Sequence, residues 1–183
     1  MDKRTEIRLA GEGGQGMILA GIILAEAAAI YDGKQTTQTQ SYGPEARGGA
    51  SRSEVVISDG EIDHPEVLDP DVVVVLSQVA YNKFAKTVRK GGLLIVDDEC
   101  VEVEPQSIAI RVPVVRLSRE TTGRAITANT VALGVLVGLS GVVSRTAIEQ
   151  AVIARAPKGT EEINRKALEA GFLAAEQVAA QKA

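Results

Sequence analysis

Six residues near the start of the chain, GEGGQG at positions 11–16, have the spacing of a backbone anion site. Gly11, Gly13 and Gly16 satisfy the pattern G-x-G-x-x-G, with strand-like residues before them and an apolar, helix-like stretch after them. Because glycine has no Cβ, the N–H groups of such a loop can closely approach an anion at the start of the helix. The segment therefore predicts either an anion or dinucleotide site, or a tight turn that packs helix against strand.

A second glycine-rich loop, SYGPEARGG at positions 41–49, contains charged residues as well as residues that restrict the backbone. Pro44 fixes one φ angle, and the glycine pair at 48–49 allows close approach of a ligand or a partner backbone. Arg47 could form a bidentate contact with a carboxylate or a phosphate. Alternatively, Glu45 and Arg47 are solvated, or pair with each other for less than ~1 kcal/mol.

A dinucleotide site also needs an acidic residue about 20 residues further on, at the end of the second strand, to hold the ribose. The second strand-like segment here is KQTTQTQ at 34–40, which ends in Ser41 and Tyr42. Asp32 precedes that segment and therefore lies at its wrong end. NAD or FAD binding is the weaker interpretation of GEGGQG.

The composition limits the classes of function. The chain has 183 residues, a net charge of −4 and 3% aromatic residues. The negative net charge argues against nucleic-acid binding, which needs a basic face to neutralise phosphates. Cys100 is the only cysteine and His64 the only histidine, which excludes an internal disulfide and any iron–sulfur or Cys/His zinc site held by this chain alone. The longest apolar stretch, 131–143, is shorter than the roughly 20 residues that span a bilayer. We expect a cytoplasmic protein that binds neither nucleic acid nor membrane.

Strands and helices alternate along most of the chain. The expected strands are 6–10, 34–40, 53–58, 72–76, 93–96 and one or two short strands within 108–117. The expected helices are 14–30, 79–89, 130–139, 144–155 and 160 to about 180. This order predicts a three-layer α/β fold with a Rossmann-like beginning, a mostly parallel or mixed central sheet, and helices on both faces. Residues 1–183 are expected to form a single domain.

The remaining chemically capable residues favour structural roles. His64 precedes a proline and is expected in an exposed turn. Cys100 follows the acidic run 97–99, whose charges would raise its pKa, so it is expected to be inert. The acidic run itself is expected to be a solvated loop rather than a metal site. Asn129 and Thr130 are expected at the start of a helix, and Gly134, Gly138 and Gly141 are expected to allow close helix packing against the sheet or against another subunit. We predict no catalytic residue and no metal ligand in this chain.

GEGGQG after a first strand, followed by QTQSYGPEARGG, resembles the gamma subunit of 2-oxoacid:ferredoxin oxidoreductases, most closely the 2-oxoglutarate type. In the fused pyruvate:ferredoxin oxidoreductases the equivalent unit is one domain of a long chain. The resemblance continues in NTVALG at 129–134 and in Lys158, Asn164, Ala167 and Gly171, and so covers nearly the whole chain.

The resemblance implies a complex that oxidatively decarboxylates a 2-oxoacid with coenzyme A, giving an acyl-CoA, carbon dioxide and reduced ferredoxin. Thiamine diphosphate with Mg²⁺ and iron–sulfur clusters would supply the chemistry. Residues 58–60 (SDG) are only a fragment of the thiamine-diphosphate signature. The cofactors are therefore expected on alpha, beta and, in some complexes, ferredoxin-like delta subunits. We expect the isolated chain to be inactive and able to self-associate.

Within such a complex, the two glycine loops are expected to lie together at the carboxyl ends of the strands and to face partner subunits near the thiamine or coenzyme A region. Arg47 would contact an anion or a partner carboxylate, and Gln15 would hydrogen-bond across the interface. The predicted cofactor-binding or interface residues are Gly11, Gly13, Gly14, Gln15, Gly16, Ser41, Tyr42, Gly43, Pro44, Glu45, Arg47, Gly48 and Gly49. Two alternatives remain: a stand-alone NAD- or FAD-binding Rossmann-type dehydrogenase, and a stand-alone anion-binding scaffold without a redox role.

Overall fold

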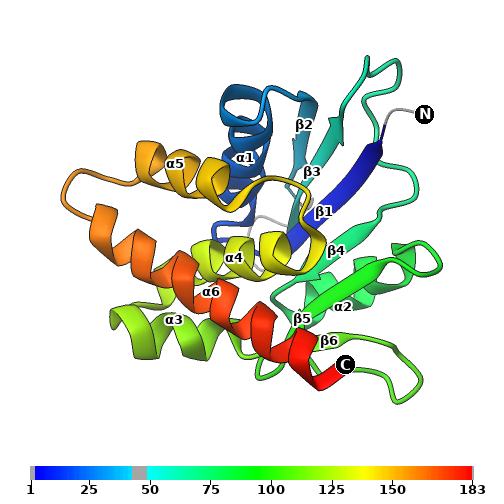
Figure 1. Ribbon diagram of the computed structural model, residues 1–183. Coiled ribbons are helices and arrows are strands. Elements are labelled where there is room, and N and C mark those ends of the chain that lie inside the picture. The colour runs from blue at the N-terminus through cyan, green and yellow to red at the C-terminus, as the bar shows by residue number, and fades with distance from the viewer. Residues whose placement is uncertain (1–2, 43–48, 183) are drawn as a thin grey trace.

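A six-stranded mixed sheet lies at the centre of the protein (Figure 1). The structure is a computed structural model that describes residues 3–42 and 49–182. The sheet order is β2-β3-β1-β4-β5-β6, in which β1, β4, β5 and β6 are parallel while β3 is antiparallel to both β1 and β2. The strands are β1 (Arg4–Glu12), β2 (Gln35–Ser41), β3 (Ala50–Ser58), β4 (Val72–Val75), β5 (Leu93–Asp97) and β6 (Ile110–Val112).

Helices cover both faces of the sheet, as a three-layer α/β fold requires (Figure 1). One face carries α2, and the other carries α1 and α4 with α5 and α6 packed outside them. None of the helices in the described part of the chain has the length and apolar character that a membrane crossing needs. The helical elements are α1 (Met17–Glu26), the π-helix η1 (Ala27–Tyr31), α2 (Gln78–Phe84), the 3₁₀ turns η2 (Ala85–Thr87) and η3 (Ala125–Thr127), α3 (Val114–Thr122), α4 (Ala128–Ser140), α5 (Arg145–Arg155) and α6 (Glu161–Lys182).

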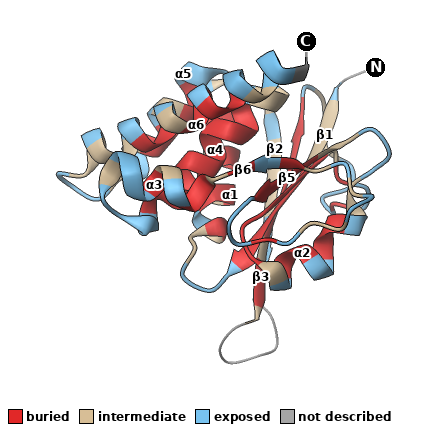
Figure 2. Ribbon diagram, turned by 90° about the horizontal axis from the view of Figure 1, so that it is seen from below, coloured by how far each residue is buried: buried red, intermediate tan, exposed pale blue. Residues whose placement is uncertain are grey.

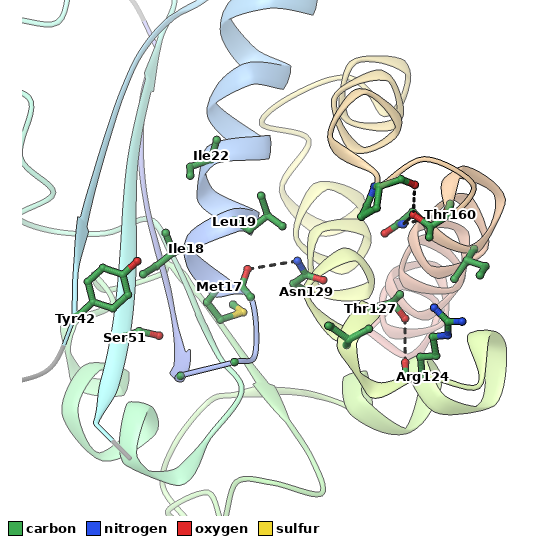
Figure 3. A pocket seen from close by; sticks show the side chains of 17 residues that line it. Met17, Ile18, Leu19, Ile22, Tyr42, Ser51, Arg124, Thr127, Asn129 and Thr160 are labelled. Carbon is green, nitrogen blue, oxygen red and sulfur yellow. Dashed lines mark hydrogen bonds between the residues drawn. The ribbon is translucent and has the colours of Figure 1, made fainter. Parts of the chain in front are cut away.

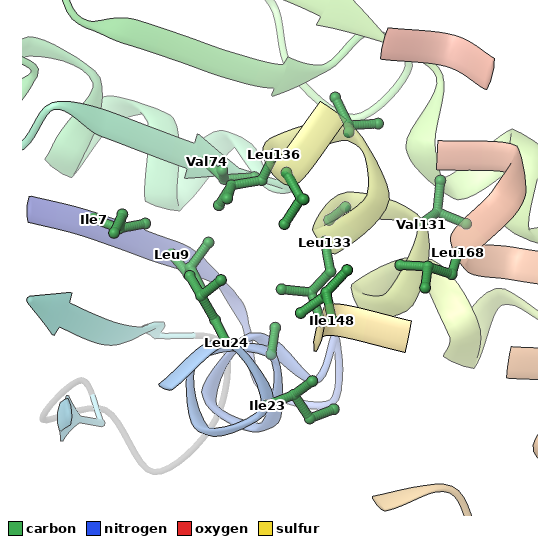
Figure 4. Packing of buried hydrophobic residues seen from close by; sticks show 14 of the residues in the cluster. Ile7, Leu9, Ile23, Leu24, Val74, Val131, Leu133, Leu136, Ile148 and Leu168 are labelled. Carbon is green, nitrogen blue, oxygen red and sulfur yellow. The ribbon is translucent and has the colours of Figure 1, made fainter. Parts of the chain in front are cut away.

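Successive side chains of a strand point to opposite faces of the sheet, so the buried strands contribute to a core on each face. Ile7, Leu9 and Val74 point towards α1 and α4, where Leu24 and Leu133 meet them (Figure 4). The intervening residues of β4, Val73 and Val75, pack with α2 on the other face. Figure 2 shows the buried strands running between these helical layers. The main core therefore lies on the face that α1 and α4 cover.

Helices α4 and α6 pack with their backbones in contact, because glycines face each other at the crossing. A Cβ on Gly134 would overlap the Leu168 carbonyl oxygen and would lie 2.9 Å from the Cα of Gly171. At Gly138 a Cβ would lie 2.6 Å from that of Ala175. Gly134 and Gly138 allow the expected close packing, but its partner is α6 of the same chain instead of the sheet or another subunit, and Gly141 ends α4 in a left-handed conformation with φ 61°.

Two expected elements differ from the structure. Within 108–117 only Ile110–Val112 is a strand, and helix α3 begins at Val114 directly after Pro113. Proline has no N–H to continue the ladder and is readily accepted just before or within the first turn of a helix. The helix expected at 14–30 begins at Met17, because Gly14 and Gly16 have φ angles of 92° and 73°.

Asp97 corrects the expectation of a solvated acidic run. Its residue is fully buried, whereas Asp98 and Glu99 are exposed as expected. The Asp97 carboxylate accepts N–H groups from Glu99 (3.0 Å) and Cys100 (2.7 Å), and its second oxygen accepts the N–H of Val115 at 2.8 Å. These bonds join the end of β5 to the first turn of α3. Among the described residues, no group of three or more His, Cys, Asp or Glu side chains could hold a metal ion.

We predict that Asp97→Asn lowers the free energy of unfolding by about 1–3 kcal/mol, because one N–H acceptor becomes an NH₂ donor at a buried site. The exposed neighbour supplies the matched control, and Asp98→Asn should change stability by less than about 0.5 kcal/mol. Urea unfolding followed by circular dichroism measures both. Equal midpoints for the two variants would contradict the role assigned to Asp97.

Candidate functional site

The two glycine loops begin at the same edge of the sheet. Strands β1 and β2 run in the same direction, and in the register Ser41 and Ala10 both pair with Arg52 of β3. The glycine loop after β1 and Tyr42 after β2 therefore lie near each other at the carboxyl ends of these strands. Of the predicted site, Gly43, Pro44, Glu45, Arg47 and Gly48 lie outside the described residues, so the contacts predicted for Arg47 remain predictions.

A pocket of about 720 Å³ opens between this edge and the starts of α4 and α6 (Figure 3). Tyr42, Ser51 and Ile18 line one side of it, and Asn129, Thr127 and Arg124 line the other. Its volume is within the range of small-molecule and cofactor sites. The full lining comprises Gly13, Gly14, Gly16, Met17, Ile18, Leu19, Ile22, Tyr42, Ser51, Arg124, Ile126, Thr127, Asn129, Pro157, Thr160, Ile163 and Asn164.

Gln15 fixes the glycine loop from within. Its side-chain Oε1 accepts the N–H of Glu12 at 2.8 Å, and its Nε2 donates to the carbonyl of Leu76, just after β4, at 2.9 Å. Both ends of the amide are thus engaged inside this chain. The predicted hydrogen bond of Gln15 across an interface stays a prediction, while within the chain Gln15 positions the loop against β4.

A chain of polar contacts holds three helix starts around the pocket. Asn129 on α4 donates from Nδ2 to the Gly16 carbonyl at 3.4 Å (Figure 3). Its Oδ1 accepts the N–H of Thr130 at 2.9 Å. Thr130 donates to Asn164 on α6 (3.1 Å), which in turn donates to the Thr160 carbonyl (3.0 Å). The expected helix-start positions of Asn129 and Thr130 are confirmed, and Asn129 also connects α4 to the glycine loop.

The pocket combines apolar walls with donors for an anion. Neither α1 nor α4 has a side-chain N-cap or an acidic residue in its first turn, so N–H groups at the start of α1 are available to a ligand or to water. Arg124 is the one charged side chain among the described residues that line the pocket. Apolar residues, including Met17, Ile18 and Ile22, form much of the remainder. Such a site suits a ligand with an apolar portion and an anionic group.

Sequence reasoning predicted four of the seventeen residues that line this pocket. Gly13, Gly14, Gly16 and Tyr42 line it, whereas Gly11, Gln15, Ser41 and Gly49 are not among its lining residues. The η3 residues Ile126 and Thr127, and above all Arg124 just before η3, were missed. The available signal was RAITA at 124–128, directly before NTVALG, which places an arginine shortly before a helix that lacks an acidic first turn.

His64 and Cys100 lie outside this pocket. His64 is exposed, as expected. Partial burial raises the pKa of the Cys100 thiol to about 11, with further contributions from its hydrogen bond to Asp97 and from the charges of Asp97 and Glu99. The neutral thiol is therefore favoured at physiological pH, in agreement with the expected inertness.

The family described as pyruvate ferredoxin/flavodoxin oxidoreductase matches residues 6–174. The chain belongs to this family. A 2-oxoglutarate synthase subunit KorC from Methanocaldococcus jannaschii is 49% identical over 179 residues, covering 96% of this chain and 96% of the relative. KorC from Methanothermobacter marburgensis is 51% identical over 176 residues, covering 92% and 95%.

Solved structures in the family share the fold. The gamma subunit of a keto/oxoacid ferredoxin oxidoreductase from Geobacter sulfurreducens superposes with a TM-score of 0.88 at 47% identity, covering 96% of this chain and 98% of that one. A 2-oxoglutarate:ferredoxin oxidoreductase from Magnetococcus marinus, with 2-oxoglutarate, coenzyme A and succinyl-CoA bound, has a TM-score of 0.83 at 24% identity. The match covers 96% of this chain but 31% of that longer chain, which has the same fold in this part.

The alternative of a Rossmann-type dehydrogenase is wrong. Family membership and the gamma-subunit fold exclude it, and the sheet supplies a physical reason. Antiparallel β3 lies between β1 and β2, and β2 ends in Ser41 rather than in a carboxylate. The ribose-binding carboxylate of a dinucleotide site is therefore not placed beside the glycine loop.

We predict that Gly16→Ala destabilises the glycine loop and its contact with α4. An added Cβ would lie 2.8 Å from the Asn129 Nδ2 atom, at a φ of 73° that alanine rarely adopts. The expected loss in unfolding free energy is about 1–3 kcal/mol. Gly13→Ala is the matched control, since a Cβ there meets nothing within 4 Å, and urea unfolding should show it close to the wild type. If the two variants unfolded together, the contact would not constrain the loop.

Cys100 should react slowly with iodoacetamide while the chain is folded. At pH 8 a thiol with a pKa of about 11 is ionised in roughly one molecule in a thousand, whereas an unfolded cysteine is far more ionised. We expect alkylation to be roughly ten- to a hundredfold slower in buffer than in urea, with the folded rate rising up to about pH 11. Mass spectrometry over time gives both rates. A folded rate that is already maximal at pH 9 would contradict the raised pKa.

Proposed function

We propose that this chain, as a single domain, is the gamma-type subunit of a 2-oxoglutarate:ferredoxin oxidoreductase, and that its pocket binds part of coenzyme A at the boundary with the catalytic subunits. The similarity to KorC subunits over nearly the whole length of both chains supports the complex and its substrate. The pocket at the carboxyl edge of the sheet, with its apolar walls and anion donors, is the observation that carries the site.

The decarboxylation and electron-transfer cofactors are assigned to partner subunits. The chain has one cysteine, too few to hold an iron–sulfur cluster. Within the described residues there is also no cluster of acidic side chains for the Mg²⁺ of thiamine diphosphate. Alpha and beta subunits, with a ferredoxin-like delta subunit, would hold these groups, and a ferredoxin would accept the electrons. Decarboxylation and electron transfer would therefore take place on partner subunits, and this subunit would contribute to ligand binding and assembly.

Coenzyme A fits the donor set of the pocket. Its phosphates need cations and N–H donors, which Arg124 and the start of α1 supply. Its apolar portion would lie against side chains such as Ile18 and Ile126. In the reaction, coenzyme A contributes the thiol that accepts the acyl group. The related Magnetococcus protein binds coenzyme A, which supports this choice of ligand.

Exposed apolar residues at the rim indicate where partner subunits contact the chain. Tyr42 is 70% exposed and Ile126 is 71% exposed, and both line the pocket. Large apolar side chains that gather on a surface commonly mark interaction sites. A partner subunit seated over this rim would cover them and complete the coenzyme A site.

Anaerobic co-expression with alpha- and beta-type subunits from the same organism tests the proposed complex. We expect the tagged chain to recover larger subunits that contain thiamine diphosphate and iron–sulfur clusters, and the preparation to reduce ferredoxin with 2-oxoglutarate and coenzyme A. Recovery of the chain alone from cells that contain those subunits would contradict the proposal. Faster turnover of a different 2-oxoacid would contradict the proposed substrate but not the proposed complex.

Arg124→Ala tests the coenzyme A site in the assembled complex. We expect the KM for coenzyme A to rise about tenfold, because a charged hydrogen-bonding group is lost, with kcat and the KM for 2-oxoglutarate changed less than about twofold. Arg111→Ala, an exposed arginine on β6 at the far edge of the sheet, is the matched control. An unchanged KM for coenzyme A in the Arg124 variant would contradict the proposal that this pocket binds coenzyme A.

A further inference from the structure

Strand β2 forms one edge of the sheet, and in the described part of the chain only β3 pairs with it. In an antiparallel ladder, alternate residues direct their N–H and C=O groups away from the neighbouring strand. The outer edge of this seven-residue strand therefore presents a row of backbone donors and acceptors. We propose that this edge pairs antiparallel with β2 of a second copy of the chain, which joins the two sheets across a two-fold axis.

The composition of β2 distinguishes it from a protected edge. Its sequence QTTQTQS contains neither a charge nor a proline, and its last three residues are exposed. The opposite edge, β6, has three residues and carries the exposed Arg111. Short strands and charges are the means by which proteins keep sheet edges from pairing. This chain uses both at β6 and neither at β2.

A second copy suits this edge because the strand is complementary to itself. Full-length antiparallel pairing centres on Gln38, and places Gln35 opposite Ser41 and Thr37 opposite Thr39. Every such pair is neutral and can hydrogen-bond, so no like charges meet. Thr36 would face Gln40, which is likewise neutral and polar.

Exposed apolar side chains stand at both ends of β2. Ile30 (67% exposed) and Tyr31 (38%) lie on η1, which leads into the strand, and Tyr42 (70%) follows directly after it. Antiparallel pairing brings the start of one strand beside the end of the other. The apolar groups of the two copies are thereby gathered at each end of the joint ladder, where their burial would add to the backbone hydrogen bonds.

The test uses the full chain and sedimentation equilibrium. We expect the wild type to be a dimer, and Gln35→Lys/Ser41→Lys to weaken dimerisation about tenfold or more, because it places lysines opposite lysines at both ends of the ladder. Gln35 and Ser41 are both exposed, so the variant should keep the wild-type circular dichroism spectrum and unfolding midpoint. Gln150→Lys, on an exposed position of α5, is the control for added charge and should remain a dimer.

A charge-swapped partner identifies the occupant of the edge. Gln35→Glu/Ser41→Glu should also be largely monomeric alone, whereas an equimolar mixture with the lysine variant should form a heterodimer, since opposite charges then meet. A wild-type chain that sediments as a monomer at every concentration that stays in solution would overturn the proposal. Lysine variants that dimerise like the wild type, or a mixture that stays monomeric, would overturn it as well.

Discussion

The close approach of Gly16 to Asn129 is the contact on which the pocket depends. Gly16 has a left-handed φ of 73°, which turns the chain from β1 into α1, and the absence of a Cβ lets the Asn129 amide reach its carbonyl. Asn129 in turn is joined through Thr130 to Asn164 on α6. Three helix starts far apart in the sequence are thereby held around one space. A side chain at position 16 would separate α4 from the glycine loop.

The mixed sheet gives this chain a pocket that differs from a dinucleotide site, although both begin with a strand, a glycine loop and a helix. Because β3 returns antiparallel between β1 and β2, the end of β2 is one strand further from the glycine loop than in a Rossmann fold. The space beside the loop is bordered instead by Tyr42 and Ser51 and closed by α4 and α6. A strand–glycine–helix motif therefore determines the conformation of the turn. Which ligand binds there depends on the residues that the sheet places beside the turn.

The distribution of chemistry in the chain is consistent with a subunit that binds and assembles. Its one thiol is held in the neutral form, its one histidine is an exposed loop residue, and its buried carboxylate Asp97 serves backbone N–H groups. The groups that remain available are backbone donors, one guanidinium and apolar surface around the pocket. They can hold a ligand and a partner, and the reacting cofactors would come from other chains.

The sequence by itself determined the α/β class, most of the strands, the two glycine loops and, through their motifs, the family. These features depend on local patterns: apolar runs, glycine positions and residue order. It did not determine that Pro113 precedes a helix or that Asp97 is buried, because the contact between them, the hydrogen bond from Val115 to Asp97, joins residues eighteen apart. Nor could it place Arg124 opposite Tyr42, since their proximity results from how α4 and α6 pack on the sheet. Local pattern therefore decided which elements form, and only the tertiary structure decided which of their residues share a site, because long-range packing brings them together.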